Sequence, residues 1–287
     1  MRLSRIVFAL LVLLLSFSIS IGAQEPVHGL WVWKTPAVLA QPNAAERLRE
    51  FCRSEHINEV YVAFTAAEKA GPSEESQLAG LIRLLHKSHI EVEALLSSTD
   101  ADEPGKSRDK LLGHVREVIA FNQRHSTAAF DGIHLDIEPQ QRPENKGPGN
   151  LKFLPGLVDA YRSVRHLAEP AHLTVNADIQ NKLLKGDSAQ RQSLLSSLPR
   201  ITLMLYELSS PNDGESSAQK EDKLSDSASR FMDLAYAGLT DPKLARMAIG
   251  LRTPDYGPLM SQMLNTLDHT LRGNPHYLGW AWHQYSQ

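Results

Sequence analysis

The sequence predicts an α/β protein, a (β/α)8 TIM barrel whose last helix is short or missing. From residue 29 onward, short apolar segments alternate eight times with helical patterns, which favours parallel strands joined by right-handed crossovers. The 287 residues leave room for one barrel of about 250 residues after an N-terminal segment. A doubly wound open sheet has the same alternation, but no glycine fingerprint for a dinucleotide or phosphate follows any strand.

Each predicted strand is a short run of apolar or alternating residues, and each predicted helix repeats its apolar residues every three or four positions. We expect strands at residues 30–33, 59–64, 92–97, 133–137, 173–177, 201–206, 247–251 and 277–282. We expect helices around residues 46–54, 78–85, 111–119, 157–167, 191–195, 231–237 and 259–271. Polar and glycine- or proline-rich residues predict loops at 140–150 and 209–228.

Side-chain alternation along the strands favours closure into a barrel. In the fourth strand, aliphatic Ile133 and Leu135 alternate with His134 and Asp136. A parallel strand that helices cover on both faces should be apolar throughout. The polar face is therefore expected to point into a barrel and towards its C-terminal mouth, where the active sites of such barrels lie.

The N-terminal segment has the pattern of a secretory signal peptide. Arg2 and Arg5 precede an apolar run at residues 6–15, and small residues lie near position 23. An uncleaved membrane anchor is the alternative, because further apolar residues prolong the run. We expect residues 1–23 to be removed, residues 24–287 to form a single TIM-barrel domain, and the protein to be secreted or periplasmic without membrane attachment.

Composition excludes several classes of protein. A net charge of −3 argues against a nucleic-acid-binding protein, because no excess of positive charge exists to contact phosphates. A lone cysteine, Cys52, excludes an intrachain disulfide framework and a zinc ribbon. No segment suggests a bound nucleotide, flavin or haem, so we expect no cofactor. We also expect no metal ion, and we expect the protein to be a monomer.

The fourth strand carries the strongest chemical signal. His134, Asp136 and Glu138 share one face, and neighbouring same-face positions lie ~6.6 Å apart along a strand. Two ionised carboxylates in a dry site repel, so one of them should hold a proton at neutral pH and could act as a general acid. A salt-bridged structural cluster inside the barrel is the alternative interpretation.

This segment resembles the strand-4 signature of the family-18 glycoside hydrolases, Asp-Gly-x-Asp-x-Asp-x-Glu. Asp131, Gly132, Asp136 and Glu138 match, and His134 stands where the family has its middle aspartate. Weaker similarities follow in the family's order over residues 29–283: Met204-Leu205-Tyr206-Glu207, then Gly250 with Tyr256-Gly257, then Gly279-Trp280-Ala281-Trp282. Strand 3 departs from the family, because it reads Ser97-Ser98-Thr99 where the family often has Ser-x-Gly-Gly.

The resemblance implies roles for these residues. Glu138 would protonate the glycosidic oxygen. Asp136 would orient a substrate 2-acetamido group that attacks the anomeric carbon, and Tyr206 would hydrogen-bond that group. Trp280 or Trp282 would form the floor of the sugar subsite, Trp282 being preferred because it is nearer the mouth. His134 would hold Asp136 by a charge-assisted hydrogen bond and keep it ionised.

Other polar and aromatic residues near strand ends are weaker candidates for contact with a sugar. Trp31 and Trp33 could line a sugar platform or could be core residues. Asn176 and Asp178 at the tip of the fifth strand could contact substrate or cap the strand. Arg252 could grip substrate or pair with Asp255, and Glu207 replaces an aspartate of the resembled family.

Three functions are compatible with these residues. The first is a retaining glycosidase that cleaves an oligo- or polysaccharide with 2-acetamido sugars, with Glu138 as general acid/base. The second is a carbohydrate-binding barrel without catalysis, although relatives of that kind usually lose the glutamate. The third is a metal-dependent hydrolase built on His134, Asp136 and Glu138. It is less favoured, because a single strand rarely supplies a whole metal site.

Overall fold

Eight parallel strands, paired in sequence order from β1 to β8 and back to β1, close into a barrel. The structure, a computed structural model, describes residues 26–64, 71–147, 149–206, 208–210 and 212–285. The strands are β1 (Val27–Val32), β2 (Glu59–Ala63), β3 (Glu91–Ser98), β4 (Gly132–Ile137), β5 (Thr174–Gln180), β6 (Arg200–Met204), β7 (Arg246–Arg252) and β8 (Tyr277–His283). The predicted barrel is confirmed, and every predicted strand overlaps an observed one.

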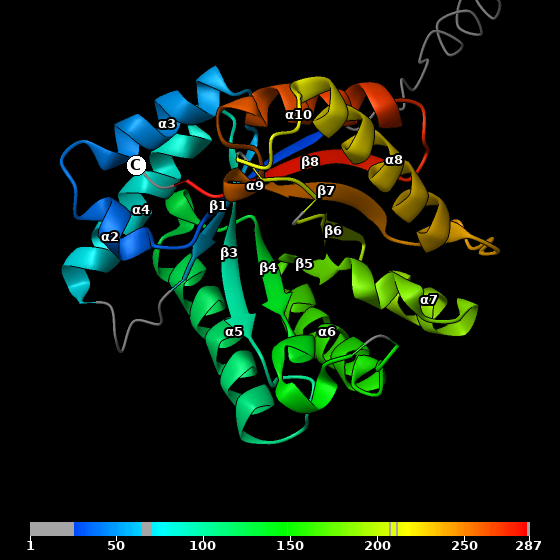
Figure 1. The fold of residues 1–287 in the computed structure, drawn as a ribbon. Coiled ribbons are helices and arrows are strands. Elements are labelled where there is room, and N and C mark those ends of the chain that lie inside the picture. The colour runs from blue at the N-terminus through cyan, green and yellow to red at the C-terminus, as the bar shows by residue number, and fades with distance from the viewer. Residues whose placement is uncertain (1–25, 65–70, 148, 207, 211, 286–287) are drawn as a thin grey trace, which may run out of the picture.

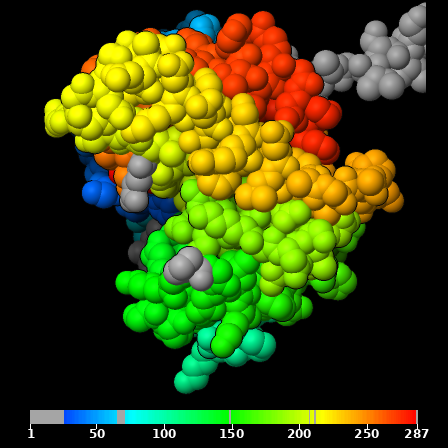
Figure 2. Space-filling model, turned by 45° about the vertical axis from the view of Figure 1, so that its right-hand side comes forward, coloured from blue at the N-terminus to red at the C-terminus, as the bar shows by residue number. Residues whose placement is uncertain are grey.

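Helices surround the strands, as Figure 1 shows. They are α2 (Thr35–Leu39), α3 (Ala44–Ser54), α4 (Pro72–His86), α5 (Lys106–Arg124), α6 (Leu154–Ala168), α7 (Ser188–Leu195), α8 (Ser217–Tyr236), α9 (Thr253–Tyr256) and α10 (Met260–Leu271). Figure 2 shows one face of this outer layer, where α8, α7 and α6 follow one another from top to bottom in yellow to green. Within the described residues no helix follows β8, as expected for a short or missing last helix.

The expected polar loop at 209–228 is partly wrong. Helix α8 begins at Ser217, where the Ser216 side chain accepts a hydrogen bond from the Gln219 backbone and the Gln219 side chain accepts one from the Ser216 backbone. This capping box satisfies two of the free N–H groups at the helix start. Leu224 and Phe231 are buried on one face of α8, whereas the rest of its surface is mainly polar, so its composition resembles that of a loop.

Two separate apolar clusters reflect the alternation along the strands. The large cluster lies between strands and helices and includes Ile133, Leu135 and Ile137 of β4. The small cluster lies inside the barrel and contains Trp31, Tyr61, Leu95 and Ala281, with Trp33 and Ala63 packed against it. The remaining inward positions are largely polar, which is the arrangement predicted from the strand pattern.

Two sequence predictions concern the chain's N-terminus and its relation to a membrane. Residues 1–23, the expected signal peptide, lie outside the described residues. Among the residues described, no helix is both long enough and apolar enough to span a bilayer.

Candidate active site

Asp136 and Glu138 stand at the C-terminal end of β4, where the barrel opens. Asp136 is the last inward-facing residue of the strand and is only 7% exposed. Glu138 follows the strand directly and is half-buried. Its backbone N–H donates a 2.8 Å hydrogen bond to the carbonyl oxygen of Ser98 at the end of β3. The backbone of Glu138 is thus held against the end of the neighbouring strand.

Three glutamines hold the Glu138 carboxyl group. Gln180 donates to Oε1 at 2.7 Å, and Gln140 donates to the same oxygen at 3.2 Å. Gln141 donates to Oε2. Gln140 and Gln141 lie in a short 3-10 turn that begins at Pro139, whereas Gln180 is the last residue of β5. The carboxyl group therefore has a defined orientation, although no sequence pattern indicates these glutamines.

The local environment favours protonation of both carboxyl groups. Burial raises the pKa of Asp136 well above its usual range, and the charges of Asp178 and Glu138 raise it further. Burial also raises the pKa of Glu138, although the hydrogen bonds from Gln180 and Gln140 act in the opposite direction. The pair therefore retains protons at a higher pH than isolated carboxyl groups do, as a general acid requires.

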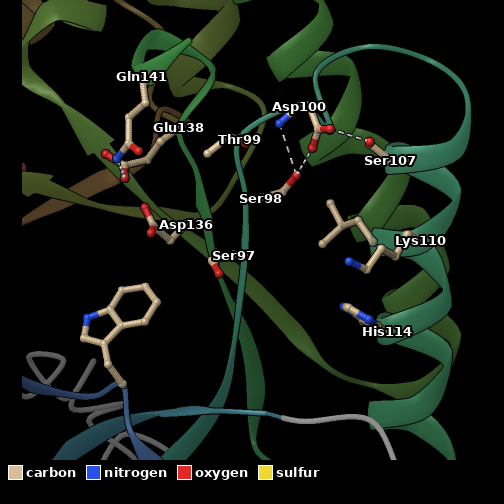
Figure 3. Close-up of a pocket in the computed structure, with 12 residues that line it drawn as sticks. Ser97, Ser98, Thr99, Asp100, Ser107, Lys110, His114, Asp136, Glu138 and Gln141 are labelled. Atoms are coloured by element: carbon tan, nitrogen blue, oxygen red, sulfur yellow. Dashed lines mark hydrogen bonds between the residues drawn. The ribbon is translucent and has the colours of Figure 1, made fainter. Parts of the chain in front are cut away.

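A cavity of about 430 Å³ opens beside the pair. In Figure 3, Asp136, Glu138 and Gln141 lie on one side of it, and Lys110 and His114 of α5 lie on the other. The end of β3 and the loop after it supply Ser97, Ser98, Thr99 and Asp100, and the first turn of α5 supplies Ser107, so hydroxyl and carboxyl groups predominate here. The cavity is large enough for a sugar residue and mainly polar.

The predicted contact between His134 and Asp136 is wrong. His134 Nε2 lies 2.8 Å from Oδ1 of Asp178, and Nδ1 lies 2.9 Å from Oε2 of Glu93. Burial opposes the charged ring, but the carboxylates of Asp178 and Glu93 prevail and raise the pKa of His134 to about 10. Asp136 is not kept ionised either, because its own pKa is raised. The sequence could not show that two carboxylates from other strands lie closer to this ring.

Deeper in the barrel, Arg200 of β6 bridges two buried glutamates. It donates to Glu93 at 2.7 Å and to Glu59 at 2.7 Å. Burial raises the pKa of Glu59, and the Glu93 charge adds to this. Glu93 is also buried, but the charges of Arg200 and His134 lower its pKa. The charges of this layer are thus already compensated by protein groups.

The metal site considered from the sequence, His134 with Asp136 and Glu138, does not match the residues that lie closest together. Within the described residues, Glu59, Glu93 and His134 are the set whose ligand atoms lie close enough to hold an ion. His134 uses both ring nitrogens for carboxylates, and Arg200 donates to both glutamates. A cation there would have to displace the guanidinium group, so these residues fit an ion-pair network better than a metal centre.

Strand β5 extends further than predicted, and this changes which residue lies at its tip. It ends at Gln180, so Asn176 and Asp178 lie inside the barrel and are 2% exposed. Asn176 donates to Glu93, and Asp178 accepts from His134 and Trp31. Both residues are therefore buried polar contacts of the interior instead of the proposed strand cap or sugar contact.

The two tryptophans of β1 differ in position. Trp31 is fully buried and donates its indole N–H to Oδ2 of Asp178 at 2.9 Å, so it belongs to the core. A Cβ atom at Gly250 would lie 2.8 Å from its ring, so the close approach requires glycine there. Trp33 lines the cavity and is partly exposed, which makes it the β1 tryptophan available to a sugar.

The prediction that Trp280 or Trp282 forms the floor of the sugar subsite is wrong. Trp280 stacks on His28 at 4.1 Å and donates to Asp268 of α10. Trp282 packs edge-on against Phe51 of α3 and donates to Thr253. Both rings therefore face the helices. The small residues of β8, including Ala281, face inward because Trp31 already fills the barrel.

His283, which sequence reasoning missed, takes the inward position at the tip of β8. Its ring centroid lies 5.7 Å from that of Trp31, 6.2 Å from that of Trp33 and 5.5 Å from that of Tyr206. Burial lowers the pKa of His283, which favours the neutral ring. Nδ1 is buried and has no hydrogen-bond partner among the described residues. Its spacing from Ala281 was the available signal, since alternate residues share a face.

Tyr206 and Arg252 lie together at the mouth. The Arg252 guanidinium lies 5.4 Å from the centre of the Tyr206 ring and also pairs with Asp255 at 2.7 Å. Of the two roles considered for Arg252, pairing with Asp255 is therefore observed. Burial raises the pKa of Tyr206 well above its usual range, so the hydroxyl remains a hydrogen-bond donor. Glu207 lies outside the described residues.

Comparison with known proteins shows similarity of structure. No family model matches the chain, and no curated protein matches its sequence. A chitinase from Bacteroides thetaiotaomicron superposes with a TM-score of 0.57 at 14% identity, over 91% of this chain and 89% of that one. A GH18 chitinase from Pseudoalteromonas aurantia gives 0.55 at 12% identity, over 90% of this chain and 94% of the other.

A third solved structure is the PgaB (BpsB) glycoside hydrolase domain from Bordetella bronchiseptica. It superposes with a TM-score of 0.51 at 12% identity, over 90% of this chain and 93% of that domain. The barrel fold is therefore one that chitinases and another glycoside hydrolase share, as the sequence resemblance implied. At such low identity the similarity concerns the fold alone.

Proposed function

We propose that this chain is a secreted glycoside hydrolase that cleaves glycans with 2-acetamido sugars and retains the anomeric configuration. The observation that carries the proposal is the Asp136–Glu138 pair beside a polar cavity at the C-terminal mouth of the barrel. The raised pKa of each carboxyl group suits a site that must deliver a proton near neutral pH. The solved chitinases with this fold support the class of reaction.

In the proposed reaction, Glu138 gives its proton to the glycosidic oxygen as the bond from that oxygen to the anomeric carbon breaks. The carbonyl oxygen of the substrate's acetamido group forms the new bond to that carbon, in place of an enzyme nucleophile. Water then attacks the same carbon as the bond from that carbon to the acetamido oxygen breaks, and Glu138 takes a proton from the attacking water. The anomeric carbon is inverted twice, so its configuration is retained.

Asp136 and Tyr206 would serve the acetamido group. Oδ1 of Asp136 is buried and has no partner among the described residues, so it can accept a hydrogen bond from a ligand. The Tyr206 hydroxyl would donate to the carbonyl oxygen. Trp33 would contact the face of the sugar ring, because it lines the same cavity as the two carboxyl groups.

The decisive experiment compares Glu138→Gln with wild type on defined oligosaccharides with and without the 2-acetamido group. Turnover should fall by at least about 100-fold, because a general acid is lost, whereas binding should persist. Glu144→Gln is the matched control, since Glu144 is an exposed residue of the following turn and should be dispensable. Proton NMR of the freshly released sugar should show the retained anomer.

Other outcomes of this experiment identify the competing functions. Tight glycan binding without cleavage by the wild-type protein would identify a carbohydrate-binding barrel. Loss of activity on exhaustive chelation would identify a metal-dependent hydrolase. Turnover by Glu138→Gln equal to wild type would contradict the role of Glu138 directly. Cleavage of substrates without the acetamido group at the same rate would contradict substrate assistance while leaving the glycosidase assignment intact.

Secretion is the remaining part of the proposal and rests on the N-terminal sequence. Expression of the full chain in a secreting host should yield an exported, monomeric protein that begins near residue 24. N-terminal sequencing and sedimentation measure these two properties. Retention of residues 1–23 in the membrane fraction would show the uncleaved anchor instead.

A further inference from the structure

Asp178 is held by two donors, one for each carboxylate oxygen. Trp31 Nε1 donates to Oδ2 at 2.9 Å, and His134 Nε2 lies 2.8 Å from Oδ1. The side chain is only 1% exposed. An indole N–H can only donate, so Oδ2 of Asp178 is the acceptor in its contact with Trp31. Asp178 is therefore buried and its position is fixed, and its charge acts on Asp136.

The ring of His134 cannot turn away from Asp178. Its other nitrogen, Nδ1, lies 2.9 Å from Oε2 of Glu93, so each nitrogen faces a carboxylate and both act as donors. Tyr61 stacks on the ring at 3.7 Å, and Trp31 meets it edge-on at 6.1 Å. Arg200 neutralises Glu93 from the opposite side. The imidazolium is thus shared by two carboxylates and locked by two aromatic rings.

Asp178 also lies next to the catalytic pair. Strands β4 and β5 pair Leu135 with Ala177, so the next inward-facing residues on the two strands are Asp136 and Asp178. Asp136 is buried, and its Oδ1 has no protein partner within the described part of the chain. A fixed negative charge beside an incompletely hydrogen-bonded carboxyl group favours the protonated form of that group.

We propose that Asp178 is a positioning residue: held by Trp31 and His134, it keeps a proton on the Asp136–Glu138 pair. This inference rests on the function proposed above and adds a residue that touches neither the substrate nor the reacting atoms. It also explains the histidine at position 134, which serves a carboxylate of strand β5 and not one of its own strand.

The charges around Asp178 agree with this role. The titratable side chains around it, apart from the catalytic pair, are Tyr61, Glu93, His134, Tyr161, Tyr206 and His283. Among these, Glu93 is the one anionic at neutral pH, and its charge is compensated by Arg200 and His134. After burial, the Asp178 charge is the largest cause of the raised pKa of Asp136, and it outweighs the opposing charge of His134.

The test is Asp178→Asn, which preserves the shape of the side chain and removes its charge. The titration of Asp136 and Glu138 is followed by carbon-13 NMR of the carboxyl groups in the free protein, with assignments from Asp136→Asn and Glu138→Gln. Both midpoints should move to lower pH. Asn176→Ala is the matched control on the same strand, because Asn176 contacts Glu93 and not Asp178, and it should leave the midpoints unchanged.

Kinetics provide the second readout. In Asp178→Asn the basic limb of the kcat/KM profile should move to lower pH, and kcat should fall more than KM rises, because substrate contacts are intact. If no glycan is cleaved, the NMR titration still decides the inference, so its failure and that of the proposed function are distinguishable. Unchanged midpoints in a folded Asp178→Asn protein would overturn it.

A second variant covers the case in which Asp178→Asn does not fold because His134 loses a counter-charge. The double variant Asp178→Asn with His134→Gln removes both charges together, and neutral replacement of an ion pair is better tolerated than loss of one partner. Its Asp136 midpoint should also lie below that of wild type, because the Asp178 charge outweighs that of His134. A midpoint equal to or above wild type would contradict the proposal.

Discussion

Nε2 of Gln180 lies 2.7 Å from Oε1 of Glu138 and donates a hydrogen bond from the end of β5 to the end of β4. This bond stabilises the ionised carboxylate and therefore lowers the pKa of Glu138, against the larger effect of burial. One neighbouring amide thus limits how strongly Glu138, the proposed general acid, retains its proton.

Replacing Gln180 with Leu should raise the pKa of Glu138 further, because burial is then opposed by fewer donors. If Glu138 is the general acid, the basic limb of the kcat/KM profile should move to higher pH. Gln192→Leu is a control, since Gln192 lies on α7 and bonds Asp241, away from the site. A basic limb that moves to lower pH would contradict this assignment of Gln180.

Asp136→Asn should lower kcat by about 100- to 1000-fold, the usual cost of losing a preorganised group that stabilises charge in the transition state. KM should change less, because most substrate contacts remain. Asp131→Asn is the matched control at the opposite end of β4, where Asp131 accepts from His86 and from the backbone of Val92. Steady-state kinetics should show near-normal kcat for this control, and an equal loss in both variants would argue against a special role for Asp136.

Replacement of Trp33 should affect activity, whereas replacement of Trp282 should affect the stability of the fold. Trp33→Ala should lower kcat/KM by about tenfold, equivalent to about 1.4 kcal/mol, because a contact in the cavity is lost. Trp282→Ala should instead destabilise the fold by about 3 kcal/mol, because its ring packs on Phe51 outside the barrel. Denaturant unfolding and steady-state kinetics on both variants check this. If Trp282→Ala instead lowered kcat/KM and Trp33→Ala destabilised the fold, Trp282 and not Trp33 would be the sugar contact.

Glu59 should make stability depend on pH. Burial and the Glu93 charge raise its pKa from the ordinary 4.5 to about 8 in the folded protein. The folded state then binds more protons than the unfolded state between these values, so the free energy of unfolding should fall as pH rises through this window. The stabilisation is complete below about pH 4.5 and lost above about pH 8.

Glu59→Gln removes this titration while Asp136 and Glu138 remain in both proteins. The free energy of unfolding, measured by denaturant at several pH values from 4.5 to 8, should therefore depend less steeply on pH in the variant. Equal slopes in the two proteins would show that Glu59 is ionised in the folded state.

Much of the fold could be predicted because strand and helix periods differ and each is visible in local sequence. The alternation on β4 correctly placed Ile133 and Leu135 against the helices and Asp136 inside the barrel. On β8 the resemblance implied that Trp280 or Trp282 faces a sugar, but both faces of this strand carry apolar residues, and Trp31 from another strand already fills the interior. Periodicity alone cannot determine a face when neither face is polar.

The sequence by itself determined the barrel, the strand that carries the two carboxyl groups and the mouth at which they lie, because these follow from local patterns. Only the tertiary structure decided the partners of those groups. Asp178, Glu93 and Gln180 come from other strands, and their distances to His134 and Glu138 depend on register and side-chain packing across the barrel. Electrostatic effects on a carboxyl group act through space. The protonation of the site therefore depends on which residues the closed barrel brings near the two carboxyl groups.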